Sequence, residues 1–63
     1  MPRSAKEMIK FLKKNGFVIL RQNGSHVQMR NYVTGRQTTV PNHGSKSLDK
    51  GLEHEILKQD GLL

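Results

Sequence analysis

The chain has 63 residues and a formal net charge of +6, from eleven Lys or Arg against five Asp or Glu. At this length it forms one domain at most, buries only about 60% of the surface that it exposes when unfolded, and is too short for a large cofactor-binding enzyme. It has no cysteine for a disulfide or a thiolate metal site, which suits a reducing cytosol, and we expect neither a membrane span nor a signal peptide.

The positive charge is unevenly distributed along the chain. Residues 1–46 hold nine Lys or Arg and one acid, a balance of +8, whereas residues 47–63 hold two Lys and four acids, a balance of −2. A basic block of this kind usually meets a polyanion, because each neutralised phosphate releases condensed counterions. The alternative is that the surplus lysines and arginines serve solubility alone.

The first expected element is a helix from about Ala5 to Lys14. Ser4 to Glu7 fits the S-x-x-E capping box, in which the hydroxyl and the carboxylate satisfy each other's free backbone N–H groups. Asn15-Gly16 is a helix stop. One apolar stripe recurs at helical spacing: Ala5, Met8, Ile9 and Leu12. The lysines fall on the other faces: Lys6, Lys10, Lys13 and Lys14.

Three strands are expected next, over residues 17–21, 25–32 and 36–40. The first is rich in β-branched and aromatic residues, and the second alternates apolar and polar side chains. Asn23-Gly24 between them is a strong hairpin signal, because both residues tolerate positive φ. A second turn lies near Thr34-Gly35, and Pro41 ends the third strand by withholding a ladder donor.

A loop leads to a second helix, expected from about Leu48 to Gln59 and closed by Asp60-Gly61. Its apolar residues are spaced for one buried stripe: Leu48, Leu52, Ile56 and Leu57. Gly51 costs about 1 kcal/mol relative to Ala inside a helix, so it marks either close packing or a later start. The order α-β-β-β-α predicts an α+β fold, a three-stranded antiparallel sheet with both helices on one face.

Strand parity predicts which side chains face the helices. If the first hairpin turns symmetrically about Asn23-Gly24, opposed residues share a face, and four apolar residues are covered: Val18, Leu20, Val27 and Met29. A symmetric turn at Thr34-Gly35 covers Val40 as well. Phe17 and Ile19 are then expected to point outward. The open face is predicted to hold a polar and basic set: Arg21, His26, Gln28, Arg30, Tyr32, Gln37 and Thr39.

His26 is the candidate for catalysis. It follows Gly24-Ser25 at the start of a strand, and an imidazole, with an unperturbed pKa of about 6.5, both accepts and donates a proton near neutral pH. Beside Arg21 and Arg30 it could remove a ribose 2′-OH proton, so that the oxygen attacks the adjacent phosphorus while the guanidinium groups stabilise the added charge. Gly24 would allow close backbone approach and Ser25 would donate to a phosphate oxygen. The alternative is an ordinary strand histidine on a solvated sheet.

The other two histidines are weaker candidates. His43 and Lys46 precede the second helix, whose N-terminus could hold a phosphate. The position of His43 alone favours the alternative, a turn residue whose ring caps a backbone group. His54 lies between two glutamates and is expected to be a solvated surface residue. The histidines are scattered and no H-E-x-x-H spacing occurs, so we expect neither a metal site nor a cofactor.

Further residues could bind RNA. The lysines of the first helix flank either a nucleic-acid groove or a solvated helix face, and Tyr32 could stack on a base or cover the sheet edge. The candidate RNA- or phosphate-binding residues are Gly24, Ser25, Arg21, Arg30, Lys10, Lys14, His43 and Lys46.

Four stretches, in this order, resemble the HicA (YcfA-like) toxin family: Gly16-Phe17, Gly24-Ser25-His26, Val40-Pro41-x-His43 and Ile56-Leu57-Lys58-Gln59-x-Gly61-Leu62. The resemblance covers nearly the whole chain. It implies a fold like the double-stranded RNA-binding domain and a ribosome-independent mRNA interferase that a cognate HicB antitoxin neutralises. It places the active-site histidine of the family at His26, and His43 at a recurrent family position.

Two functions from different classes follow. The first is a cytoplasmic toxin that acts as a metal-independent endoribonuclease, with His26 as general acid/base. We expect this toxin to be a monomer, and we expect its HicB-type antitoxin to cover the His26 face with an acidic docking surface. The second is a non-catalytic RNA-binding module of double-stranded RNA-binding type, which has no need of one imidazole because such modules read shape with Lys and Arg. A weaker third reading is a small basic ribosome-associated protein.

Overall fold

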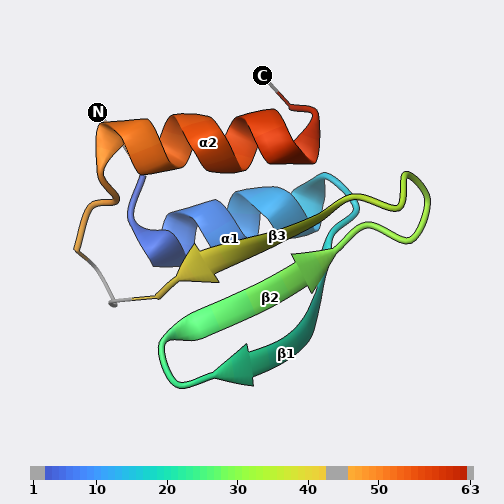
Figure 1. The fold of residues 1–63 in the computed structure, drawn as a ribbon, viewed down its shortest axis with the longest axis horizontal. Coiled ribbons are helices and arrows are strands. Elements are labelled where there is room, and N and C mark those ends of the chain that lie inside the picture. The colour runs from blue at the N-terminus through green and yellow to red at the C-terminus, as the bar shows by residue number, and fades with distance from the viewer. Residues whose placement is uncertain (1–2, 43–45, 63) are drawn as a thin grey trace.

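The computed structural model describes residues 3–42 and 46–62 of the chain (Figure 1). The elements follow in the predicted order: α1 (Ala5–Lys14), β1 (Val18–Asn23), β2 (His26–Arg30), β3 (Gln37–Pro41) and α2 (Lys50–Asp60). The strands form one antiparallel sheet in the order β1-β2-β3, and the predicted α+β fold is confirmed. Within the described residues, neither helix is long and apolar enough to cross a membrane.

The first helix matches its predicted bounds because its caps are strong. The Ser4 hydroxyl accepts from the Glu7 N–H at 3.1 Å, and the Glu7 carboxylate accepts from the Ser4 N–H at 2.9 Å. This reciprocal pair is the predicted capping box. The backbone N–H of Asn15 closes the other end by donating to the carbonyl of Leu12 at 3.0 Å.

The second helix begins two residues later than predicted. Asp49 is its N-cap, and the Asp49 carboxylate accepts from the backbone N–H of Gly51 at 3.1 Å. Gly51 therefore lies in the first turn. Of the two explanations for this glycine, the later start of the helix is the one that the structure supports. Gly61 ends the helix with φ +74°, the left-handed conformation that favours glycine. Leu48 precedes the helix, yet its side chain is buried.

The core lies between the helices and one face of the sheet. Nine buried apolar residues of the described part of the chain form it: Ala5, Met8, Leu12, Phe17, Val27, Met29, Val40, Leu48 and Ile56. The burial of Val27, Met29 and Val40 confirms the predicted parity of β2 and β3. The outward prediction for Phe17 is wrong. Its N–H donates to the carbonyl of Leu12 at 3.0 Å, so the residue turns under the end of α1 before β1 begins.

The predicted burial of Val18 and Leu20 is also wrong, because β1 contains a β-bulge. A two-residue turn at Gly24-Ser25 joins β1 to β2, so that Asn23 lies opposite His26 and Arg21 lies opposite Gln28. The register then shifts between Arg21 and Ile19. The extra residue reverses the parity of the strand beyond it. The side chain of Val18 is 48% exposed and that of Leu20 is 41% exposed.

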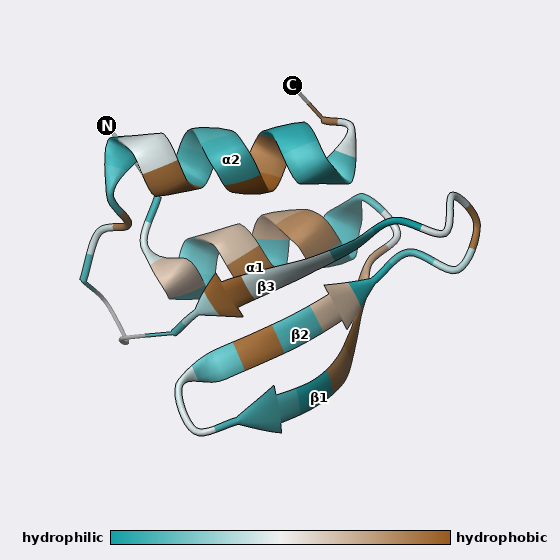
Figure 2. Cartoon of the chain, viewed as in Figure 1, coloured by the Kyte–Doolittle hydropathy of each residue, from teal (hydrophilic) through white to brown (hydrophobic). Residues whose placement is uncertain are grey.

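β1 is an edge strand that the helices do not cover. Ile19 lies opposite the buried Met29, which places it on the helix side of the sheet, so the prediction that it points outward is wrong. It is nevertheless 45% exposed, because the helices do not cover this edge. Figure 2 shows apolar residues at the start of β1, on the side of the sheet farthest from α2. The three consecutive apolar side chains of β1 therefore contribute little to the core.

Candidate functional site

The face of the sheet opposite the helices carries the predicted polar set. Opposed residues share a face, and the register places them in three successive rows: Asn23, His26 and Pro41; Arg21, Gln28 and Thr39; Val18, Arg30 and Gln37. The predicted placement of the histidine and the two arginines on one open face is confirmed. We refer to these three rows as the open face.

His26 is the first residue of β2, and its side chain is exposed. The turn before it is fixed to the end of β3, because the backbone N–H of Asn42 donates to the carbonyl of Ser25. Gly24 has φ +58°, and apart from Gly24 and its two chain neighbours no atom of the described residues lies within 4 Å of the position that a Cβ would take there. The space above the turn is thus open to a ligand beside the imidazole.

Glutamines on the open face hold both arginines. Arg21 Nε donates to Gln28 Oε1 at 3.2 Å, and Arg30 Nη1 donates to Gln37 Oε1 at 3.0 Å. Each bond uses one of the five guanidinium N–H donors, so donors are left for a phosphate. Alternate residues of a strand are about 6.6 Å apart, so the row of Arg21 is one step from His26 and that of Arg30 is two steps away.

The acids of the chain lie elsewhere. The five acidic residues are all in or beside the helices: Glu7, Asp49, Glu53, Glu55 and Asp60. The three strands contain none, as their sequences show. The positive charge of the open face is therefore not neutralised within the sheet, and no strand supplies a carboxylate to orient His26.

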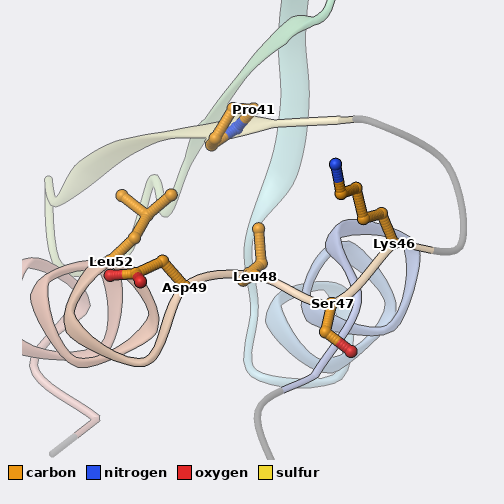
Figure 3. A pocket seen from close by; sticks show the side chains of 6 residues that line it. All are labelled: Pro41, Lys46, Ser47, Leu48, Asp49 and Leu52. Atoms are coloured by element: carbon orange, nitrogen blue, oxygen red, sulfur yellow. The ribbon is translucent and has the colours of Figure 1, made fainter.

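A pocket of about 380 Å³ adjoins the His26 row (Figure 3). It lies between β3 and the start of α2, and its lining is largely apolar: Pro41, Lys46, Ser47, Leu48, Asp49 and Leu52. Pro41 is the residue opposite His26 in the sheet. The predicted phosphate site at this helix N-terminus is disfavoured, because the capping carboxylate of Asp49 already occupies it.

The predicted lysines of α1 are not brought to His26. Lys10 and Lys14 line a shallow groove of about 320 Å³ with Glu7 and Phe11, on a helix that packs against the other face of the sheet. Only a ligand that wraps around the molecule would contact both surfaces.

The remaining histidines add nothing to the open face. His43 lies outside the described residues. His54 is exposed on α2, as predicted. Within residues 3–42 and 46–62, no three His, Asp or Glu side chains gather as a metal site would require.

Sequence reasoning missed the role of Asn31. Its Oδ1 accepts from the backbone N–H groups of Val33 at 2.8 Å and Thr34 at 3.1 Å, and its Nδ2 donates to the carbonyl of Asn15 at 3.2 Å. This buried side chain fixes the β2–β3 loop and ties it to the end of α1. An asparagine directly before a turn is the signal that could have revealed it, because its side chain bonds the backbone two residues on.

This fold and site define a class of protein: a small α+β domain whose uncovered sheet face carries two arginines and one histidine. The sequence model of the family described as HicA toxin of bacterial toxin-antitoxin matches residues 5–62. A curated relative named "Probable mRNA interferase HicA", from Pseudomonas fluorescens (strain Pf0-1), is 36% identical over 56 residues, which are 89% of this chain and 90% of the relative. The chain therefore belongs to the HicA toxin family, as its motifs predict. No solved structure matches it, and the likeness to the double-stranded RNA-binding domain stays a prediction.

Proposed function

We propose that this chain is a toxin that cleaves mRNA as a ribosome-independent endoribonuclease, with His26 as general acid/base. The observation that carries the proposal is the exposed imidazole on the same open face as Arg21 and Arg30. Family membership supports it, and so does the printed name of the relative from Pseudomonas fluorescens, an mRNA interferase.

The chemistry follows from the groups on the open face. The His26 imidazole removes the proton of a ribose 2′-OH, and the 2′ oxygen attacks the adjacent phosphorus. The bond from phosphorus to the 5′ oxygen breaks, and the leaving oxygen takes a proton from the imidazolium or from water. The products are a 2′,3′-cyclic phosphate and a 5′-OH. Because the RNA supplies its own nucleophile, the mechanism needs no metal.

The neighbouring residues stabilise and position the phosphate. Arg21, one row from His26, donates to the oxygens that gain charge in the transition state, and Arg30 binds a phosphate farther along the strand. Ser25 offers a hydroxyl beside the imidazole, and Gly24 leaves room for the RNA backbone.

The partner that inhibits such a toxin is a HicB-type antitoxin. Because the open face contains cations and no acid, the docking surface of the antitoxin is acidic and covers His26. Opposite charges of this kind give fast, salt-dependent association. The free toxin acts as a monomer, since one chain holds every residue that the mechanism uses.

The proposal is tested by cleavage of single-stranded RNA in EDTA. We expect His26→Ala to lower the single-turnover rate by about 10²- to 10⁴-fold, the usual contribution of a general acid/base. His54→Ala, which changes an exposed histidine on α2, is the matched control and keeps its rate. Cleavage that persists in His26→Ala, at equal thermal stability, would show that the assignment is wrong.

The same assay distinguishes the alternative, a non-catalytic RNA-binding module. That module binds RNA with steep salt dependence, leaves it intact, and responds little to His26→Ala. A substrate with a single 2′-deoxy nucleotide provides a second criterion. The endoribonuclease spares the bond after the deoxy nucleotide and cleaves elsewhere, because only that bond has lost its nucleophile.

A further inference from the structure

Tyr32 extends the open face beyond the end of β2. The Arg30 guanidinium carbon lies 5.5 Å from the centroid of the Tyr32 ring, so the ring lies on the same side of the sheet as Arg30. Between them, Asn31 points the other way and is buried. The Tyr32 side chain is 67% exposed. A ring in contact with a cation and otherwise open to solvent is a surface on which a base can stack.

The loop holds this ring in place. Asn31 donates its N–H to the carbonyl of Arg36 at 2.9 Å, and its own carbonyl accepts from Gly35 at 2.8 Å. Together with the side-chain bonds of Asn31, these contacts fix the backbone on both sides of Tyr32. A ligand that stacks on the ring therefore does not have to order the loop, which lowers the entropic cost of binding.

The distance from His26 to Tyr32 fits a short nucleic-acid strand. From His26 to Arg30 the four strand steps of about 3.3 Å give about 13 Å. Tyr32 lies two residues beyond the end of β2, so the span to it is at most about 20 Å. Stacked nucleotides rise about 3.4 Å each, so this length corresponds to about six of them, or to about half as many when the strand is extended. Arg21 and Arg30 lie along the way, where phosphates would pass.

We infer that β2 and Tyr32 form a track for single-stranded RNA, with the scissile phosphate at His26 and a base some three to six nucleotides away stacked on Tyr32. The inference rests on the proposed function, because it defines the substrate of that site as a single strand. In a duplex the bases already stack on one another, so a duplex cannot offer a free base face to this ring.

The sequence provides a direct probe of the inference. Tyr32 is the single tyrosine and the chain has no tryptophan, so the intrinsic fluorescence of the protein reports on this ring. We would titrate the unaltered protein with 2′-O-methyl oligonucleotides of two to ten residues, which lack the nucleophile for cleavage, and with a duplex of the same sequence. Emission is corrected for RNA absorbance.

We expect the single strands to quench the tyrosine, with affinity that rises with length and levels off between about three and six nucleotides. The duplex binds through phosphates without that quenching. Tyr32→Ala weakens single-strand binding by roughly 5- to 100-fold, as the loss of one stacked base does, and leaves its salt dependence unchanged. Tyr32→Phe restores the binding. Val33→Ser, at the 93% exposed neighbour, is the control without effect.

The results separate this inference from the proposed function. Equal quenching by the duplex, no dependence on length, or no effect of Tyr32→Ala would overturn the track, whatever His26 does in the cleavage assay. Length-dependent quenching in a protein that cleaves no RNA would support the track and overturn the catalytic role instead.

Discussion

Asp60 is a buried carboxylate at the end of α2. Its side chain is 4% exposed, and neither carboxylate oxygen has a hydrogen-bond partner among the described residues. Burial raises the pKa of Asp60 from 3.8 to about 6, and the positive charge of Arg36 opposes part of that rise. The folded state therefore prefers the protonated acid, whereas the unfolded chain ionises it near pH 4.

This carboxylate makes the protein less stable as pH rises. With the folded pKa above the unfolded one, its stabilising contribution is full below about pH 4 and is lost as pH rises through about 6. The loss amounts to about 3 kcal/mol, at 1.4 kcal/mol per pKa unit. We expect Asp60→Asn to match the native protein at pH 4 and to be more stable at pH 7.5.

Urea unfolding between pH 4 and pH 8 measures this difference. Glu55→Gln removes an exposed acid from the same helix and is the matched control, without a pH-dependent change. A difference between Asp60→Asn and the native protein that is constant across this range would contradict the raised pKa.

At the scale of elements, the β1 bulge decides which apolar residues matter for stability. We expect Leu20→Ala to lower the free energy of unfolding by only about 1 kcal/mol, because Leu20 is already 41% exposed. Val27→Ala removes fewer atoms but costs about 2 kcal/mol, because Val27 is 1% exposed and the change leaves a cavity. Chemical denaturation of both variants checks the order, and the reverse order would place Leu20 in the core.

The capping box of α1 is a second contribution that can be measured. Ser4→Ala removes the hydroxyl that accepts from Glu7 and should cost about 1 kcal/mol of stability. Ser47→Ala is the control, because Ser47 pairs with Ser4 only through the backbone and its side chain is exposed. Thermal unfolding of the two variants checks the expectation, and equal costs would mean that the cap contributes nothing.

The elements that could be predicted from sequence are those with local signals. Ser4 with Glu7 and the Asn15-Gly16 stop define α1 without any tertiary information, and Pro41 marks the end of β3. The bulge at Leu20 has no such signal, because it depends on pairing between two strands and not on the residues of either. Its effect on burial in β1 was therefore beyond a parity argument.

The candidate site shows the same division. His26 and Arg21 share a face because residues on both sides of a tight turn keep their parity, which the sequence allows one to count. The separation of Lys10 from His26 follows from the predicted placement of both helices on the face opposite the open face, whereas charge alone carries no such information. The anchoring by Asn31 depends on the carbonyl of Asn15, sixteen positions away.

On the scale of the whole molecule, charge is sorted by layer. The sheet contributes arginines and no acid, and the helical layer holds every acid together with lysines of its own. A net charge of +6 would attract any polyanion. The positive charge of the open face, which no acid in the sheet neutralises, also determines how a polyanion is oriented when it binds. An acidic partner that approaches is thus steered toward His26.

Association with a HicB-type antitoxin tests whether layer or net charge governs docking. The double variant Arg21→Glu, Arg30→Glu reverses the open face, and we expect its association rate at low salt to fall by at least about tenfold, with the deficit shrinking as salt screens the charges. The double variant Lys10→Glu, Lys14→Glu changes the net charge by the same amount, but on α1. Its association rate should fall much less. Stopped-flow mixing at several salt concentrations measures both. Equal slowing of the two double variants would mean that net charge alone drives the encounter. The proposal that the antitoxin docks on the open face would then be wrong.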